Sequence, residues 1–498
     1  MASGYVYIVG AGPGDPGLLT LAGADALAVA DVVLYDRLAS EELLSLAGPD
    51  AELIPCGKHP GGVGEVGISQ EEIDELLLSY ADQGKVVVRL KGGDPCLFGR
   101  GGEEALLLEE AGIPYEIVPG VTAAAAAIYA GIPLTHRGLS SMAVLATGHE
   151  DPAKNSPQVP WRDLAGLGGT FSVYMGAGRA KELATELAAG GLSGSTPVAV
   201  LAWLSTPRQR ATITTVAALA AGRLVAEAPA LVIVGEVVRL GERIRWFERR
   251  PLRGVSVLLL RPKGRGGELA AQLRRLGALV HHAPAVRLEP APDQEALASA
   301  LREAGRRQWV VFTSAAGVEF SWRALRRAGL DARAFAGARL AAVGPATAEA
   351  LERVGLVADL VAPDVTTASL AEALSAAGAG DVLCLRSSAA DDGMARALSA
   401  GGAAVDEVVA YSCVEDEAAE ERVAAALEAG IDYILLTSAL VAEVAGRHGA
   451  ARCVAAVSIG PATTAAARRF GFDVVAEASP HTADGLLEAL VSAAAGKG

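Results

Sequence analysis

The second half of this chain contains an internal repeat, and this repeat limits the possible folds more than any other feature of the sequence. Three stretches of the first copy return in the same order in the second. They are "VLLLRP" (257–262) and "VLCLRS" (382–387), "VVFTSAAGVEF" (310–320) and "ILLTSALVAEV" (434–444), and "AVGPATAEALERVGL" (342–356) and "SIGPATTAAARRFGF" (458–472). Each copy alternates short apolar runs with helical patterns, which is typical of parallel strands covered by helices. We therefore expect two similar α/β lobes with a ligand-binding cleft between them.

Hydroxyl side chains stand where the strands of both copies give way to helices. Ser314 and Ser438 lie in the repeated Thr-Ser turns, and Thr347, Thr463 and Thr464 lie in the repeated Gly-Pro-Ala-Thr turns. A hydroxyl at such a junction can cap the helix, and the free amides can meet an anion. The sequence leaves open whether these residues bind a ligand or serve as helix caps alone.

Tyr411 interrupts the repeat at a point where the chain is predicted to cross between lobes. The two crossings are expected in 277–290 and 402–415, and Tyr411 in the second corresponds to Val286 in the first. A phenol at such a hinge would project near the cleft, where it could donate a proton to a leaving hydroxyl. A tyrosine that only packs against its neighbours explains the residue equally well.

The first half opens with a glycine-rich turn, "VYIVGAGPGDPGLLT" (6–20), that follows an apolar strand. A dinucleotide fingerprint requires glycine at its sixth place, where this chain has Asp15. Pro13 and Pro16 each lack an amide donor, so the loop is poorly suited to phosphate. We expect a ligand without phosphate, and a dinucleotide-dependent oxidoreductase remains the weaker alternative.

Other predicted strands of the first half also end in polar residues or glycines. Ligands of open α/β sheets bind outside the carboxyl ends of the strands, so these positions are candidates for one site. They are Asp36 and Arg37 in "VVLYDRL" (32–38), Lys58 in "PCGKHPG" (55–61), Gly92 and Gly93 in "VVVRLKGGDPCLFGRGGEE" (86–104), Thr135, His136 and Arg137 in "GIPLTHRG" (131–138), and Met175 in "TFSVYMGAG" (170–178).

Composition excludes several classes of function. The net charge of −15 argues against non-specific binding to nucleic acid. Neither a long apolar run nor a basic segment followed by an apolar one is present, so we expect no membrane span and no signal peptide. The five cysteines are scattered without a C-x-x-C pair, which indicates buried thiols in a cytoplasmic protein and no metal site.

The motifs of the first half resemble a known family. "GAGPGDPGLLT", "YDRL", "RLKGGDPCLFGRGGEE", "VPGVTAAAAA", "GIPLTHR" and "YMG" occur in the order found in uroporphyrinogen-III C-methyltransferases of the tetrapyrrole methylase superfamily. The second half resembles uroporphyrinogen-III synthase through V-F-T-S, V-G-x-x-T, S-I-G-x-T-T and the tyrosine at the crossing. The resemblance implies a methyltransferase domain at 1–248, a linker at 249–254 and a synthase domain at 255–498.

The resemblance also implies a fold, a cofactor and site residues. The fold class would be α/β, with a two-lobed methylase, usually homodimeric, followed by a bilobed synthase. S-adenosylmethionine would be the methyl donor, with Asp36 as proton acceptor and Lys58 as proton donor. Thr135, His136 and Arg137 would contact the substrate of the methylase. The donor would be bound by Pro13, Gly92, Gly93, Asp94, Leu97, Thr122, Ala123, Met175 and Leu204.

Two positions depart from the pattern of the methylase family. His59 stands where an arginine is usual, in a loop that is longer than the family pattern by about three residues. Leu204 stands where the family usually has glycine. These departures put the role of Lys58 and the shape of the donor pocket in question.

The implied function is bifunctional tetrapyrrole biosynthesis. The synthase would cyclise hydroxymethylbilane to uroporphyrinogen III with inversion of ring D, assisted by Tyr411, while Ser314, Thr347, Ser438, Thr463 and Thr464 bind the substrate. The methylase would then methylate C2 and C7 to give precorrin-2, for sirohaem or a corrinoid. An alternative is a methylase of a later corrin intermediate with a non-catalytic C-terminal binding module. Neither NAD-dependent oxidation nor iron insertion is expected.

Overall fold

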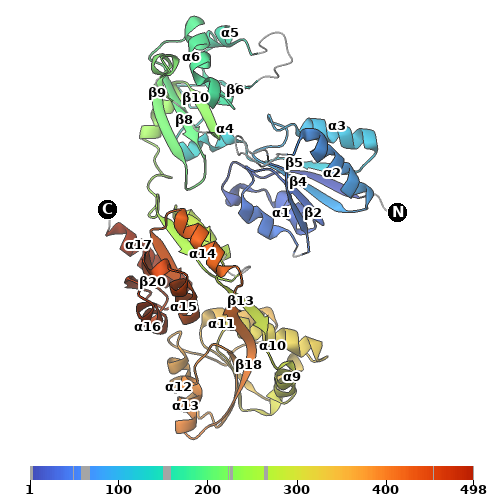
Figure 1. The fold of residues 1–498 in the computed structure, drawn as a ribbon, viewed down its shortest axis with the longest axis vertical. Coiled ribbons are helices and arrows are strands. Elements are labelled where there is room, and N and C mark those ends of the chain that lie inside the picture. Colours follow the sequence, from blue (N-terminus) through green and yellow to red (C-terminus); the bar gives the residue numbers. More distant parts are fainter. Residues whose placement is uncertain are drawn as a thin grey trace. The chain divides into compact units, whose positions relative to one another are not determined.

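The computed structural model describes residues 4–48, 50–57, 68–149, 159–222, 224, 228–262, 267–452 and 454–496. The chain divides into two compact units, Met1–Arg253 and Gly254–Gly498, and both are built of helices packed on sheets (Figure 1). Within the described ranges, none of the helices combines the length and hydropathy that a bilayer crossing requires.

The first sheet of the first unit is entirely parallel, with the strand order β3-β2-β4-β1-β5. Helices cover both faces, because apolar side chains of α2 and α3 form one core cluster and those of α1 form another. Helix α2 begins with a capping box in which Ser69 and Glu72 bond each other's amides. The bounds are β1 (Tyr5–Gly10), β2 (Val32–Tyr35), β3 (Glu52–Pro55), β4 (Val86–Lys91), β5 (Tyr115–Val118), α1 (Leu21–Ala28), α2 (Gln70–Asp82) and α3 (Gly101–Ala111).

The second sheet of the first unit is mixed, with the order β6-β7-β10-β8-β9. Helices α5, α6 and α7 pack on one core cluster, and the alanine-rich α4 packs on the other. Because β7 and β8 are both antiparallel to β10, their carboxyl ends lie at the same edge. The bounds are β6 (Ala143–Thr147), β7 (Thr170–Tyr174), β8 (Pro197–Ala202), β9 (Arg210–Thr215), β10 (Ala230–Val234), α4 (Ala123–Ala126), α5 (Trp161–Ala165), α6 (Ala180–Ala189) and α7 (Val216–Ala220).

The second unit also has two sheets. One is parallel, with the order β12-β11-β19-β20-β21. The other has the order β13-β18-β17-β14-β15-β16 and is parallel except for β13. The strand bounds are β11 (Ser256–Leu259), β12 (Leu279–His282), β13 (Val286–Pro290), β14 (Trp309–Phe312), β15 (Arg339–Ala342), β16 (Leu360–Val361), β17 (Asp381–Ser387), β18 (Ala404–Glu415), β19 (Tyr433–Leu436), β20 (Ala455–Ser458) and β21 (Val474–Glu477).

The helices of the second unit follow these strands and cover the sheets. Their amphipathic faces supply leucines, alanines and valines to three core clusters. The bounds are α8 (Gly267–Arg275), α9 (Gln294–Arg302), α10 (Ala315–Arg327), α11 (Pro345–Arg353), α12 (Thr367–Ala376), α13 (Gly393–Ala400), α14 (Ala419–Glu428), α15 (Ala439–Arg447), α16 (Pro461–Arg469) and α17 (Ala483–Ala495).

The two lobes of the second unit confirm the repeat but divide it differently from the sequence prediction. We name 286–415 the continuous lobe, and 255–285 with 416–496 the discontinuous lobe. Strand order β12-β11-β19-β20-β21 in the discontinuous lobe matches β18-β17-β14-β15-β16 in the continuous lobe. The first copy of the repeat thus contributes β11 and β12 to the discontinuous lobe and β14, β15 and β16 to the continuous lobe. The second copy contributes β17 and β18 to the continuous lobe and β19, β20 and β21 to the discontinuous lobe. The crossings fall in 277–290 and at the end of 402–415, as predicted.

Candidate active sites

The glycine-rich loops of the first unit are held together at the carboxyl edge of its parallel sheet. Gly12 and Gly93 exchange backbone hydrogen bonds of 3.2 and 2.8 Å, which join the loop after β1 to the loop after β4. Gly10 faces Gly120 of the loop after β5, and a Cβ on Gly10 would lie 2.6 Å from the Cα of Gly120. Such close approach of backbones is possible only for glycine.

Asp94 fixes two of these loops through its carboxylate. Oδ1 accepts hydrogen bonds from the amides of Cys96 (2.9 Å) and Leu97 (3.1 Å), and Oδ2 accepts one from the amide of Gly120 (3.1 Å). The carboxylate therefore organises the loop that carries the predicted residues Gly92, Gly93 and Leu97. In the part of the chain that the structure describes, nothing lies within 4 Å of the Cβ position of Gly93, so the described part of the loop is open there.

Loops of the second sheet contact the same edge from the other side. The amide of Asp15 donates to Oγ of Ser205 (3.1 Å), in the loop after β8. Tyr174, at the end of β7, lies 2.5 Å through its hydroxyl from Oγ1 of Thr122 and accepts from the amide of Ala124 (3.0 Å). Burial, followed by the charge of Asp15, raises the pKa of Tyr129 to about 12. The carboxyl edges of the two sheets therefore face each other.

These loops also contain unusual backbone conformations. Among the described residues, Phe98, Arg100, Met175, Trp203 and Ser205 are the non-glycine residues with positive φ, between 51° and 64°. All of them lie in loops after β4, β7 or β8, at the carboxyl edges of the two sheets. Residues held in this region cost about 1–3 kcal/mol each and concentrate at functional sites.

The predicted donor-binding residues occupy these loops. Met175 is half exposed beside Tyr174, and Phe98 packs its ring 4.9 Å from that of Tyr174. Leu204 lies between two strained residues but does not share their positive φ. Its side chain is buried in the core cluster that also contains Ala124 and Ala127, so a leucine fits where the family pattern has glycine.

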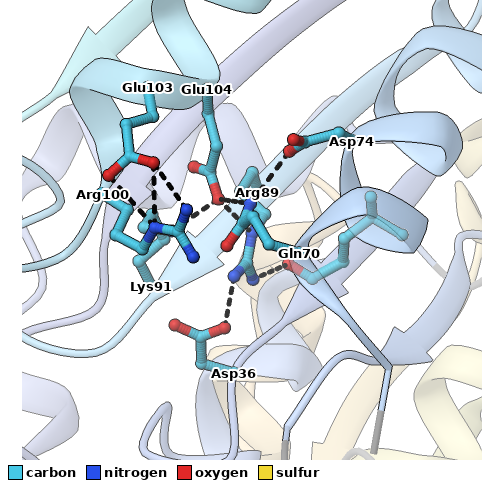
Figure 2. A network of polar contacts seen from close by, with 9 residues as sticks. Asp36, Gln70, Asp74, Arg89, Lys91, Arg100, Glu103 and Glu104 are labelled. Carbon is cyan, nitrogen blue, oxygen red and sulfur yellow. Dashed lines mark hydrogen bonds and ion pairs between the residues drawn. The ribbon is translucent and has the colours of Figure 1, made fainter. Parts of the chain in front are cut away.

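Asp36 stands at the end of β2 and belongs to a network of buried charges (Figure 2). Its Oδ1 lies 2.5 Å from the Arg89 guanidinium, which also bonds Oε1 of Glu104 (3.2 Å). Lys91 reaches the same Glu104 oxygen at 2.6 Å. Arg89, Lys91 and Glu104 are each at least 97% buried, whereas the Asp36 side chain is 30% exposed. Asp36 is thus a partly exposed member of the network, and Gln70 joins Glu104 to Asp74 in another branch.

Two other predictions from the sequence have a different outcome. Lys58 and His59 lie outside the described residues, so the predicted proton donor has no described geometry. Thr135, His136 and Arg137 are exposed in the connection that leads into β6. They therefore precede a strand, whereas the sequence interpretation placed them at the end of one. The 3₁₀ helix Ala127–Ala130 and a tight turn separate them from β5.

In the second unit, the structure brings Ser314 and Tyr411 together. Their hydroxyl oxygens lie 3.1 Å apart, although the residues are far apart in the chain. The Tyr411 ring is 7% exposed and stacks on Phe320 at a centroid distance of 5.5 Å. Tyr411 is therefore more buried than a phenol projecting into a cleft, and the packing role that the sequence left open is part of its environment.

The other predicted hydroxyls act on their own helices or on neighbours. Ser314 and Ser438 cap α10 and α15 by accepting from the amides of Gly317 (3.0 Å) and Val441 (3.3 Å). Thr464 is buried and bonds Oγ of Ser458 at 2.5 Å and the carboxylate of Glu477. Thr347 and Thr463, at equivalent positions of α11 and α16, are also buried. The capping role considered at the sequence level is present for both serines.

Comparison with known proteins adds independent evidence. Residues 5–220 match the family Tetrapyrrole (Corrin/Porphyrin) Methylases, and residues 267–488 match Uroporphyrinogen-III synthase HemD. The porphyrin biosynthesis protein HemD of Ruminiclostridium josui is 37% identical over 100% of this chain and 99% of its own length. This chain belongs to the family of proteins that join a tetrapyrrole methylase to a uroporphyrinogen-III synthase. We therefore call Met1–Arg253 the methylase unit and Gly254–Gly498 the synthase unit.

Two further relatives match parts of this chain. The uroporphyrinogen-III C-methyltransferase of Bacillus subtilis strain 168 is 40% identical over 73% of this chain and 74% of its own length. The crystal structure of uroporphyrin-III C-methyl transferase from Thermus thermophilus, complexed with S-adenyl homocysteine, is 44% identical over 48% of this chain and 100% of that chain, with a TM-score of 0.42.

Membership of this family confirms several predictions. The α/β fold class, the pairing of methyltransferase with synthase, and the use of S-adenosylmethionine are confirmed. The chain is an enzyme of tetrapyrrole biosynthesis with a methyltransferase part and a synthase part.

Sequence reasoning missed several residues of the methylase unit. Arg89 and Lys91 could have been noticed, because they interrupt the otherwise apolar strand "VVVRLK" (86–91). Tyr174 begins the motif "YMG", but neither this motif nor the sequence around Ser205 indicates their partners, which lie in other loops.

Proposed function

We propose that the synthase unit converts hydroxymethylbilane to uroporphyrinogen III with inversion of ring D. The methylase unit then methylates this product at C2 and C7 to give precorrin-2. We assign the two activities to 255–498 and 1–248, joined by the linker 249–254. The proposal rests above all on the meeting of the two carboxyl edges of the methylase unit, where Asp36 presents a carboxylate beside the glycine loops.

The methyl donor suits the loops of the methylase unit. S-adenosylmethionine contains no phosphate, and the loop after β1 has Pro13 and Asp15 where a phosphate-binding loop would offer free amides. The donor would be held by Pro13, Gly92, Gly93, Asp94, Leu97, Thr122, Ala123, Met175 and Leu204. When bound, S-adenosylmethionine supplies an electrophilic methyl group on its sulfonium.

Asp36 would act on the tetrapyrrole. Attack by a pyrrole carbon leaves positive charge on the ring, and a fixed carboxylate stabilises that charge or accepts the proton that must leave. Catalysis otherwise consists mainly of alignment, which the strained loop residues and the Asp94 contacts provide. Lys58 as proton donor, and Thr135, His136 and Arg137 as substrate contacts, remain part of the proposal.

In the synthase unit, Tyr411 would assist departure of the hydroxyl of hydroxymethylbilane. Ser314 lies within hydrogen-bond distance of the phenol and can orient it. Ser438, Thr347, Thr463 and Thr464 would help bind the substrate through the turns that start α15, α11 and α16. We further propose a cytoplasmic homodimer formed through the methylase unit.

An end-point assay tests both halves. The purified chain is given hydroxymethylbilane with and without S-adenosylmethionine, and the products are identified by chromatography and mass spectrometry. We expect type III uroporphyrinogen without the donor and a dimethylated product with it. Type I uroporphyrinogen alone would contradict the synthase activity and favour a C-terminal binding module beside a methylase of a later corrin intermediate. Type III product without methylation would contradict the methylase assignment.

A further inference from the structure

Arg89 joins three elements from the middle of the methylase sheet. It lies in β4 and is 2% exposed. Its guanidinium donates to the carbonyl of Leu34 in β2 (3.3 Å), to Glu104 in α3 (3.2 Å) and to Asp36 after β2 (2.5 Å). A guanidinium with three acceptors in different directions has little rotational freedom, so its position relative to Asp36 is fixed.

The cluster of Arg89, Lys91, Glu104 and Asp36 contains two basic and two acidic side chains. Arg89 and Lys91 are two buried cations, and Glu104 is one buried anion between them. A buried charge that lacks a partner costs several kcal/mol, so an acidic residue at position 36 matches the second buried cation. Burial lowers the pKa of Arg89, but the charges of Asp36 and Glu104 outweigh burial, and the pKa of the guanidinium is raised overall.

Stability alone does not explain why the methylase unit has this cluster of buried charges. Replacing a buried ion network by apolar residues of similar volume is often neutral or stabilising. The neighbours of Arg89 in β4 are buried valines and leucines, so an apolar side chain would suit this strand. One branch of the network leads to Asp36, a partly exposed carboxylate at the end of β2, and another leads from Glu104 through Gln70 to Asp74.

We propose that Arg89 is a positioning residue of the methyltransferase, which fixes the Asp36 carboxylate through Oδ1 and leaves Oδ2 for the tetrapyrrole. Lys91 and Glu104 set the place of Arg89. This inference rests on the proposed action of Asp36 on the substrate.

The test separates position from stability with four variants of the full chain. Arg89→Met removes the guanidinium and leaves one uncompensated negative charge. The double variant Arg89→Met/Glu104→Gln removes the guanidinium together with one acidic side chain, so that Lys91 and Asp36 remain as one basic and one acidic group. Arg89→Lys keeps the charge with a different geometry, and Arg162→Met is a matched control in an exposed ion pair of the same unit. Methyl transfer to uroporphyrinogen III, the KM for each substrate and the melting temperature are measured, with synthase activity as an internal measure of intact protein.

For Arg89→Met we expect kcat for methyl transfer to fall about 100-fold, as misplacement of a catalytic group by about 1 Å can produce. The KM for S-adenosylmethionine should stay within about twofold, since the hydrogen bonds of Arg89 within the described ranges go to Leu34, Asp36 and Glu104, and none of these residues is assigned to the donor. In the double variant the melting temperature should recover while kcat stays low. Arg89→Lys should restore part of kcat. Recovery of kcat together with the melting temperature in the double variant would overturn the proposal.

A double-mutant cycle with Asp36→Asn distinguishes the two failures. If Arg89 acts through Asp36, adding Arg89→Met to Asp36→Asn should lower kcat little further. Full activity of Asp36→Asn would contradict the proposed function of Asp36 itself. A large loss in Asp36→Asn, with an independent and multiplicative loss from Arg89→Met, would leave Asp36 in place and contradict the positioning role.

Discussion

In the methylase unit, Asp94 in the loop after β4 accepts a hydrogen bond from the amide of Gly120 in the loop after β5. In the synthase unit, by contrast, Ser438 accepts a hydrogen bond from the amide of Val441 in the helix that it caps. This difference extends through both sites. Asp15, Thr122 and Asp36 are fixed by residues of other strands or loops, and Ser314 and Ser438 are fixed first by the first turns of their helices.

The comparison indicates how substitutions should act. A residue fixed by several distant loops loses its geometry when any of those loops moves. A residue fixed by its own helix keeps its geometry until that helix unfolds. Changes around the methylase site should therefore lower activity more than stability, and changes to the caps of the synthase unit should do the reverse.

The largest expected effect comes from the pair Ser314–Tyr411. In the synthase unit this pair is an exception to the local caps, because its two residues are far apart in the chain. Tyr411→Phe keeps the stacking on Phe320 and removes the hydroxyl. We expect the rate of type III product formation to fall about 100-fold, as for loss of a general acid. Methylation of supplied uroporphyrinogen III should be unchanged. An unchanged rate of type III formation would leave Tyr411 with a packing role only.

The next effect concerns the glycine contacts of the methylase unit. In Gly120→Ala the new methyl group would contact the Cα of Gly10 at 2.8 Å, and the loops after β1, β4 and β5 would have to separate. We expect destabilisation of about 1–3 kcal/mol from overpacking. The rate of methyl transfer should fall at least tenfold, because displacement of a catalytic group by about 1 Å can lower the rate about 10²-fold.

Gly48→Ala is the matched control, because no atom of the described residues lies within 4 Å of its Cβ position. Kinetics and thermal unfolding of both variants in the full chain check the expectation. Normal methyl transfer by Gly120→Ala would mean that the close approach of the loops is not required for the site.

Smaller effects should come from the two equivalent caps. Ser314→Ala and Ser438→Ala each remove one bond to a helix amide, at a cost of about 1 kcal/mol of unfolding free energy. Only Ser314→Ala also removes the partner of Tyr411, so it should lower synthase activity more than Ser438→Ala does. Denaturant unfolding and synthase kinetics of the pair measure both quantities. Equal activity in the two variants would contradict the orienting role of Ser314.

The smallest effect is a dependence on pH at His282. Burial lowers the pKa of this imidazole, the charges of Arg274, Arg261 and Arg422 lower it further, and its bond to the Arg261 carbonyl acts in the opposite direction. The unfolded chain therefore binds the proton more readily. Stability should be constant above the unfolded value of about 6.5 and fall as the pH drops below it. Urea unfolding at pH 7.5 and 5.5 should show a smaller fall for His282→Gln, and an equal fall would remove His282 as the cause.

The sequence by itself determined the local features of this protein. Apolar runs followed by glycine or hydroxyl turns predicted the parallel α/β class, the strand ends that carry Asp36 and Gly93, and the caps Ser314 and Ser438, because periodicity and turn chemistry depend on neighbouring residues. The repeat predicted two similar lobes, because the same local pattern of strands, turns and helices occurs in both copies.

Tertiary structure alone decided which segments enter each lobe, since strand pairing joins residues of distant segments, such as β11 with β19. It also decided that Arg89 holds Asp36, that Asp94 reaches Gly120 and that Tyr174 meets Thr122. Each of these contacts forms between loops or strands whose approach is set by the packing of whole sheets and helices, and no short stretch of sequence encodes that approach.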